Sequence, residues 1–180
     1  VELVSSEDEI VPILSKYIFS VLDALQIKYG PCHSEVIMTK DGPVLVETGA
    51  RLRGTRSPKV TRECLGVSQL EISVDSYLDH PAFFARTGKP YEIKKHGMSV
   101  HLISFFDDRK MSQKGIDEIQ KLTSLFRLHL NVNPGERVSK TIDMLTSPGL
   151  IELCHKDHDV ILSDFKKIRE IESRALYVAD

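Results

Sequence analysis

The residues of this sequence that could carry chemistry gather in one stretch, residues 30–55, with the sequence GPCHSEVIMTKDGPVLVETGARLRGT. Two short apolar runs within it, residues 32–39 and 43–49, flank a turn with Asp-Gly and predict a β-hairpin. The first run carries Glu35 and the second carries Glu47. Two carboxylates with open coordination positions suit Mg²⁺, which completes its shell with substrate phosphates. The pair therefore predicts a metal–phosphate site.

The length of the hairpin loop decides whether the two acids share a face. A two-residue loop puts Glu35 and Glu47 on opposite faces, whereas a three-residue loop with Gly42 in the left-handed conformation puts them directly opposite each other. We expect the three-residue loop, which also forms three outer pairs: Val36 with Val46, Ile37 with Leu45, and Met38 with Val44. Facing carboxylates repel, so a positive group must lie between them or one must hold a proton.

Three more residues are expected on the face of the acid pair, namely His33, Gly49 and, just past the second strand, Arg51. A guanidinium there could clamp a phosphate or a carboxylate through two hydrogen bonds. Gly49 would let substrate atoms approach the backbone. The alternative stays open that the glutamates are a solvated sheet face. A basic run follows, which is either part of the site or a solvated loop: Arg51, Arg53, Arg56, Lys59 and Arg62.

The remaining pattern predicts the elements that position this hairpin. A capping box, Ser6 with Glu9, opens an amphipathic helix that ends before Gly30-Pro31. The other expected helices cover residues 69–78, 114–122 and 157–172, and the other expected strands cover residues 99–106, 125–131, 138–145 and 150–155. These elements predict an α+β fold with a mainly antiparallel sheet flanked by helices. A linker-like segment near residues 86–97 predicts a boundary between two parts, 1–86 and 87–180.

Composition is that of an ordinary globular protein. The chain has 180 residues, of which 41% are hydrophobic and 28% are charged, and its formal net charge is −2. That charge argues against a globally basic nucleic-acid binder, and no apolar run approaches the ~20 residues of a membrane helix. Three cysteines far apart in the sequence predict reduced thiols and a cytoplasmic location. Because the first residue is Val1, we expect a piece of a longer protein.

Two parts of the sequence resemble the ATP-grasp ligases. His33-Ser34-Glu35, the hairpin and then Val46-Glu47-Thr48-Gly49-Ala50-Arg51-Leu52 resemble the signature of the branch with L-amino acid ligases, carnosine synthase-like enzymes and biotin carboxylase-like proteins. The tail, residues 138–172, resembles the end of that branch. The resemblance implies the C-terminal lobe of the ATP-grasp fold: residues 1–86 as the C-terminal half of the lobe and residues 87–180 as a small α/β extension packed on it.

The resemblance also implies roles for individual residues. In the family, two acids on neighbouring strands bind the Mg²⁺ (or Mn²⁺) that bridges the phosphates of ATP, and Glu35 and Glu47 match them. The arginine after the second acid binds phosphate and the acyl intermediate, and Arg51 matches it. Three further candidates for contacting the nucleotide or a substrate are His33, Arg53 and Arg56.

The sequence departs from the family in two places. Many members have Asn as a further metal ligand where this chain has Gly49, and the Gly-Gly that follows the arginine is here Gly54-Thr55. In addition, the lysines and the glycine-rich flap that hold ATP in the family lie in the half of the ligase that precedes this region. We therefore expect this stretch of chain to be inactive by itself.

The function implied is that of an ATP-dependent ligase, which activates a carboxylate as an acyl phosphate and joins it to an amine or similar nucleophile. The expected partners are small-molecule carboxylate and amine substrates and the remaining N-terminal part of the ligase, with no nucleic acid and no membrane; a homodimer stays open. One alternative is a non-catalytic scaffold or dimerisation domain with the same fold. A second, a hydrolase of phosphoesters, would need further acids or histidines around Glu35 and Glu47.

Overall fold

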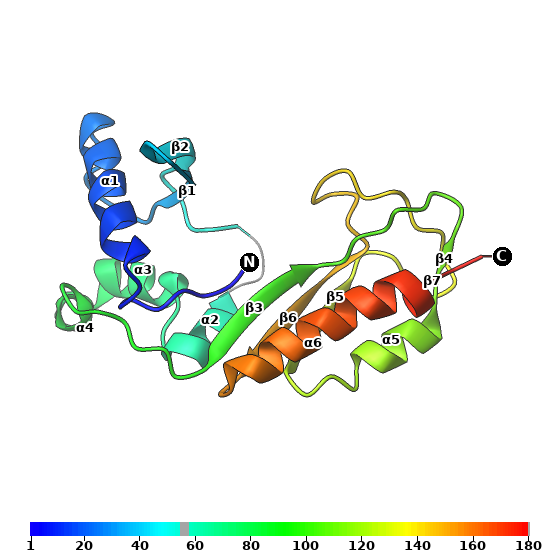
Figure 1. The fold of residues 1–180 in the computed structure, drawn as a ribbon. Coiled ribbons are helices and arrows are strands. Elements are labelled where there is room, and N and C mark those ends of the chain that lie inside the picture. Colours follow the sequence, from blue (N-terminus) through cyan, green and yellow to red (C-terminus); the bar gives the residue numbers. More distant parts are fainter. Residues whose placement is uncertain (55–57, 180) are drawn as a thin grey trace. The chain divides into compact units, whose positions relative to one another are not determined.

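The computed structural model describes residues 1–54 and 58–179, which form two compact units: Val4–Ile93, and Lys94–Asp180 together with Val1–Leu3 (Figure 1). Antiparallel sheets and flanking helices make up both units, so the predicted α+β class is confirmed. Within the described residues, no helix combines the length and the apolar character needed to cross a membrane.

The first unit is built around a two-stranded hairpin. Its elements are α1 (Ile10–Ala24), β1 (His33–Thr39), β2 (Gly42–Gly49), α2 (Pro58–Leu65), α3 (Gln69–Leu78) and α4 (His80–Arg86). Helix α1 lies beside the hairpin in Figure 1, and the Leu45 N–H of β2 donates a hydrogen bond of 2.9 Å to the Tyr17 hydroxyl of α1. This contact ties one strand of the hairpin to the helix.

The second unit has a three-stranded antiparallel sheet in the order β3-β6-β5, with helices on one face (Figure 1). Its elements are β3 (His96–His101), β4 (Lys110–Met111), α5 (Gln113–Ile119), β5 (Leu125–Leu130), β6 (Gly149–His155), α6 (His158–Ile171), a π-helical turn η1 (Glu172–Leu176) and β7 (Tyr177–Val178). Its core joins the sheet to the helices through apolar residues that include Val100, Ile119, Ile151, Leu153, Ile161 and Ile168.

A short segment at the start of the chain extends this sheet. Residues Val1–Leu3 run antiparallel to β3, with Glu2 bridged to Met98. The Ser99 N–H donates to the Val1 carbonyl at 2.8 Å, and the Leu3 N–H donates to the Gly97 carbonyl at 3.0 Å. The Ser99 N–H and the Gly97 carbonyl, on the outer side of β3, therefore have backbone partners.

Several elements differ from those predicted. The capping box at Ser6 is wrong, because its hydroxyl donates to the Tyr91 carbonyl and Asp8 instead accepts from the N–H of Ile10, the first residue of α1. The expected strand over residues 99–106 is β3, which ends at His101. Residues 138–145 form no strand, since Asp143 and Thr146 bind the backbone N–H groups around them and fold the segment into a turn.

Helices α2 and α4 were not predicted. For the basic run that includes Lys59 and Arg62, the sequence left open a part of the site or a solvated loop. These two residues lie in helix α2, which buries Val60 and Cys64. Helix α4 begins where the Asp79 carboxylate accepts a hydrogen bond from the Ala82 N–H at 3.0 Å, with a proline in its first turn. Both features are ordinary helix-start signals.

Candidate functional site

The two acids predicted to face each other do so in the hairpin. Glu35 of β1 is the register partner of Glu47 of β2. The outer pairs differ from the prediction, because the loop has two residues and Thr39 pairs with Gly42, whose φ is 112°. A β-bulge then shifts the register, with Val46 as the extra residue, and restores the pairing of the acids.

The predicted outer pairs are therefore wrong. The structure pairs Val36 with Leu45, Ile37 with Val44, and Met38 with Pro43. The bulge leaves Ile37 and Val44 on the same face as the acids, and both side chains are exposed. The face thus has an apolar outer half and a charged inner half.

In the inner half of this face, a nitrogen-bearing side chain lies near each carboxylate. The Arg51 Nη2 lies 3.7 Å from the Glu47 Oε1, and the His33 Nε2 lies 3.5 Å from the Glu35 Oε1. Both glutamates expose more than half of their side chains, at 56% and 57%. The predicted neighbours Arg51 and His33 therefore lie beside the acids, while solvent can still reach the carboxylate oxygens.

The Arg51 side chain occupies the space that we expected a substrate to enter beside Gly49. A Cβ added at Gly49 would lie 3.3 Å from both the Cγ and the Nε of Arg51. Near the other end of the side chain, a Cβ on Gly54 would lie 4.0 Å from its Nη1. The missing side chain at Gly49 therefore makes room for this arginine.

The opposite face of the hairpin base holds a cluster of small polar side chains. The Thr48 Oγ1 lies 2.8 Å from the Ser34 Oγ and 3.1 Å from the Cys32 Sγ, within hydrogen-bond distance. These contacts join β2 to the start of β1 immediately behind the acid pair. They support the pairing of the strands from the side that does not carry the glutamates.

The remaining predicted site residues have different positions. Arg53 follows β2, and its backbone N–H donates to the Gln69 Oε1 at 3.0 Å, while Arg56 lies outside the described residues. Gln69 was not predicted, because its position next to the helix cap Ser68 gave no sign of contact with the hairpin. Its side chain nevertheless contacts the Cys32 carbonyl, which precedes Glu35 in the sequence, and the Arg53 N–H, which follows Glu47.

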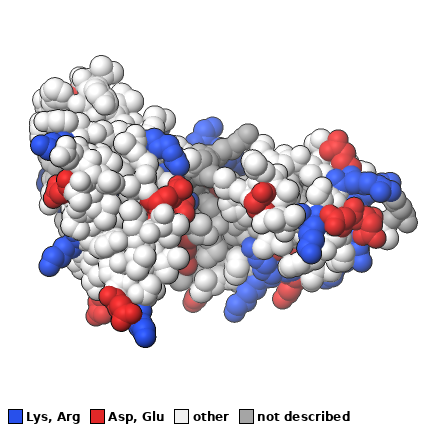
Figure 2. Space-filling view, turned by 90° about the horizontal axis from the view of Figure 1, so that it is seen from above, with Lys and Arg blue, Asp and Glu red and all other residues white. Residues whose placement is uncertain are grey.

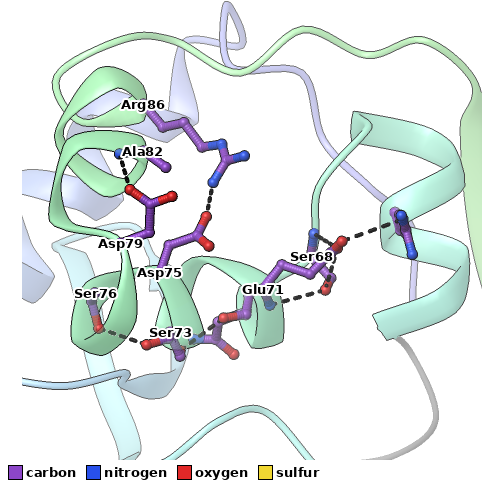
Figure 3. A network of polar contacts seen from close by, with 10 residues as sticks. Ser68, Glu71, Ser73, Asp75, Ser76, Asp79, Ala82 and Arg86 are labelled. Atoms are coloured by element: carbon purple, nitrogen blue, oxygen red, sulfur yellow. Dashed lines mark hydrogen bonds and ion pairs between the residues drawn. The ribbon is translucent and has the colours of Figure 1, made fainter.

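A cap network fixes the helix that carries Gln69. At the start of α3 the Ser68 N–H and hydroxyl each donate to the Glu71 Oε2 at 2.9 Å (Figure 3). These hydrogen bonds hold the pKa of the Glu71 carboxyl below its ordinary value. Arg62 of α2 approaches the same carboxylate, 3.3 Å from its Oε1. Further along α3, Asp75 pairs with Arg86 of α4 (Figure 3).

The donor chemistry of the acid pair suits a hard divalent cation that keeps other ligands. Within residues 1–54 and 58–179, no three or more His, Cys, Asp or Glu side chains converge as a complete metal site. Two exposed carboxylates can supply part of the oxygen shell of Mg²⁺, which in proteins takes one or two carboxylates and completes the shell with phosphates and water. Glu35 and Glu47 therefore fit a metal that arrives with a phosphorylated ligand.

The surface around both units carries charges of both signs. On the face that Figure 2 shows, lysines and arginines lie next to aspartates and glutamates rather than in patches of one sign. The formal net charge of −2 agrees with this mixture. Attraction of an anionic ligand would therefore depend on local groups such as Arg51 rather than on the field of the whole chain.

Comparisons with known proteins confirm the resemblance to ATP-grasp ligases. No protein-family model matches the chain. A curated relative, dapdiamide A synthase from Enterobacter agglomerans, is 29% identical over 163 residues, which are 89% of this chain and 38% of that protein. The chain thus spans well under half the length of the relative that it matches.

Solved structures show the same fold at low identity. An L-amino acid ligase from Bacillus licheniformis matches 97% of this chain and 44% of its own, with a TM-score of 0.71 and 19% identity. N5-carboxyaminoimidazole ribonucleotide synthetase from Thermotoga maritima matches the same shares, with a TM-score of 0.58 and 19% identity. Carboxyaminoimidazole ribonucleotide synthase from Aspergillus clavatus, complexed with ATP, matches 91% and 40%, with a TM-score of 0.56 and 15% identity.

Proposed function

We propose, from the premise that this chain has the fold of the C-terminal portion of an ATP-grasp ligase, that it supplies the metal- and phosphate-binding face of a ligase. The ligase would use ATP to join a carboxylate to an amine or a similar nucleophile. The observation that carries this proposal is the pairing of Glu35 with Glu47 beside Arg51. In the proposed arrangement, residues 1–86 belong to the ATP-binding lobe and residues 87–180 form an extension. A cytoplasmic location and a homodimer remain further proposals.

The proposed reaction has two steps. A carboxylate oxygen of the first substrate attacks the γ-phosphorus of ATP, the bond to the bridging oxygen breaks, and ADP leaves. The amine nitrogen of the second substrate then attacks the acyl carbon, the bond to the phosphate oxygen breaks, and the amine loses a proton. The protein contributes mainly position and charge in such a reaction.

Each residue of the face has a proposed part in these steps. Glu35 and Glu47 would hold Mg²⁺ from neighbouring strands, which is why their register matters. When bound, the metal would offset the negative charge on the phosphate oxygens. Arg51 would bind the oxygens of the transferred phosphoryl group, because its guanidinium presents several N–H groups in one plane. His33 is a candidate donor to phosphate or substrate, and Arg53 and Arg56 are candidates for the nucleotide or the incoming carboxylate.

Isothermal titration of Mg²⁺–ATP into the full-length parent protein tests this proposal. We expect binding heat with the natural protein and its loss with Glu47→Gln, together with ATP-dependent ligation that Glu35→Gln and Glu47→Gln each abolish. The exposed Glu7 of the same unit provides a matched control, since Glu7→Gln removes one negative charge without touching the hairpin face. Turnover by the double variant Glu35→Gln/Glu47→Gln would contradict the proposal. Absence of binding in the natural protein would favour the scaffold alternative.

A further inference from the structure

Gln69 of α3 joins the two backbone segments that border the proposed site. Its Oε1 accepts from the Arg53 N–H at 3.0 Å, and its Nε2 donates to the Cys32 carbonyl at 3.1 Å. Cys32 directly precedes β1, which carries Glu35, and Arg53 follows Arg51 by two residues. We infer that Gln69 is a positioning residue that fixes Arg51 relative to the acid pair, an inference that rests on the proposed function.

The backbone hydrogen-bond ladder of the hairpin ends next to the two segments that the Gln69 side chain contacts. The last backbone pair at the open end of the hairpin is His33 with Gly49. Beyond it the chain turns, because the Arg51 N–H donates to the Gly49 carbonyl at 2.8 Å. Within the ladder, backbone groups of the two strands bond directly to each other. Beyond its end, the Gln69 amide joins the two segments, because its oxygen accepts from one and its nitrogen donates to the other.

The two anchors leave Arg51 little freedom of backbone position. On one side of Arg51, Gly49 is held by the last pair of the ladder, and on the other side Arg53 is held by Gln69. The Arg51 Nη1 also donates to the Leu52 carbonyl at 3.1 Å, inside the anchored segment. The arginine side chain lies over Gly49, 3.7 Å from the Glu47 carboxylate. Release of the Arg53 anchor would therefore free the backbone that directs this guanidinium.

Hydrogen bonds fix the start of α3, the helix that carries Gln69. Ser68, the residue before it, is buried and forms both halves of the capping box with Glu71. The Ser73 hydroxyl donates to the Gln69 carbonyl at 2.8 Å, one turn further into α3. Gln69 is itself half-buried, so water competes less for its amide than it would at an exposed position.

The alternative is that Gln69 stabilises the fold without directing Arg51. A structural role would lower the stability of the unit by the same amount whether or not Arg51 is present. A positioning role would lower turnover only while Arg51 is there to be positioned. A double-mutant cycle between the two residues separates these cases, because it measures their coupling directly.

The experiment measures kcat and KM in the full-length parent ligase. Gln69→Met keeps the shape of the side chain and removes both hydrogen bonds, and we expect kcat to fall about 10- to 100-fold. KM for the nucleotide should stay within about twofold, since the acid pair is untouched. Gln69→Glu keeps the acceptor for Arg53 and should retain more turnover than Gln69→Met. Ser76→Ala is the control, because Ser76 loses a hydrogen bond within α3 that touches neither strand.

The decisive comparison uses Arg51→Ala as the background. There we expect Gln69→Met to change kcat by less than about twofold, because the group that it positions is gone. An equal loss in both backgrounds would overturn the inference, and so would unchanged turnover of Gln69→Met in the natural background. If Arg51→Ala and Glu47→Gln keep full turnover, the proposed function itself fails. If they lose turnover while Gln69→Met does not, only the positioning role fails.

Discussion

Glu35 and Glu47 are register partners across a hairpin whose β-bulge lies directly beside them. Their pairing brings two negative charges together at a cost, because like charges opposite each other destabilise a sheet. The Arg51 guanidinium, 3.7 Å from the Glu47 carboxylate, offsets that cost in part. A divalent cation held by both carboxylates, as proposed above, would remove this repulsion.

Neutralising one acid should leave the fold of this chain intact and slightly raise its stability. We expect Glu35→Gln to increase the free energy of unfolding by about 0.2–1 kcal/mol, because repulsion across the strands disappears. Urea denaturation at low ionic strength measures the effect, and added salt should shrink it. Glu7→Gln serves as the control at an exposed position. A loss of stability larger than 1 kcal/mol would show that the carboxylate supports the fold.

A methyl group at Gly49 should displace Arg51 without unfolding the hairpin. The added Cβ would meet the arginine side chain at 3.3 Å, and that side chain is more than half exposed and free to move aside. We expect Gly49→Ala to lower kcat of the parent ligase about 10- to 100-fold and to leave its melting temperature nearly unchanged. The exposed neighbour Ala50 offers a control, Ala50→Ser. Full activity of Gly49→Ala would show that the position of Arg51 is unimportant.

In the second unit, alanine at Gly115 should destabilise a helix that it would ordinarily favour. A Cβ there would lie 2.7 Å from the Leu176 Cα and 2.9 Å from the Ala175 carbonyl oxygen, which are backbone atoms that cannot swing away. We expect Gly115→Ala to cost about 1–3 kcal/mol, the range for overpacking, despite the higher helix propensity of alanine. Lys114→Ala, at the exposed preceding position, should change stability by less than about 0.5 kcal/mol. Thermal unfolding of both variants tests the contrast.

The buried Asp164 should make the second unit less stable in acid. Burial opposes its ionisation, yet hydrogen bonds from Lys167 and Ser124 outweigh burial and lower its pKa below the ordinary 3.8. A lowered pKa contributes stability at pH values above the ordinary one and loses it as pH falls. We expect Asp164→Asn to cost about 1–3 kcal/mol at neutral pH, because one carboxylate oxygen becomes an NH2 group that cannot accept the hydrogen bond from Ser124 or from Lys167.

Denaturation of both proteins between neutral pH and about pH 3 measures this dependence. The difference between natural protein and Asp164→Asn should shrink as pH falls below the ordinary pKa of an aspartate. The comparison cancels Glu172, whose pKa burial raises, since both proteins contain it. A difference that is constant with pH would mean that the charge of Asp164 adds nothing beyond its shape.

Much of the fold could be predicted because its signals are local. Helix α3 occupies the predicted residues Gln69–Leu78, which an amphipathic pattern marks in the sequence. The Ser68 cap at its start is a further local signal that the prediction did not use. The pairing of the acids was also predicted correctly, but with the wrong loop. A two-residue loop followed by a bulge and a three-residue loop without one give the same pairing at the base, so the spacing of Glu35 and Glu47 could not distinguish them.

The contacts of Gln69 could not be predicted from the sequence. Its partners are backbone groups of Arg53 and Cys32, 16 and 37 residues earlier, and backbone groups leave no pattern in side-chain types. The turn over residues 138–145 was missed for a related reason. Its apolar residues suggested a strand, but the local hydrogen bonds of Asp143 and Thr146 outweigh that preference.

The segment Val1–Leu3 determines how the second unit can be studied separately. A truncated protein with residues 94–180 alone would leave β3 with a bare edge, since the N–H of Ser99 and the carbonyl of Gly97 would lose their backbone partners. The unpaired backbone groups of an exposed strand edge can form hydrogen bonds with a strand of another molecule. Such a truncation would therefore tend to self-associate, and a linker that returns the first three residues to the edge of β3 should keep it monomeric.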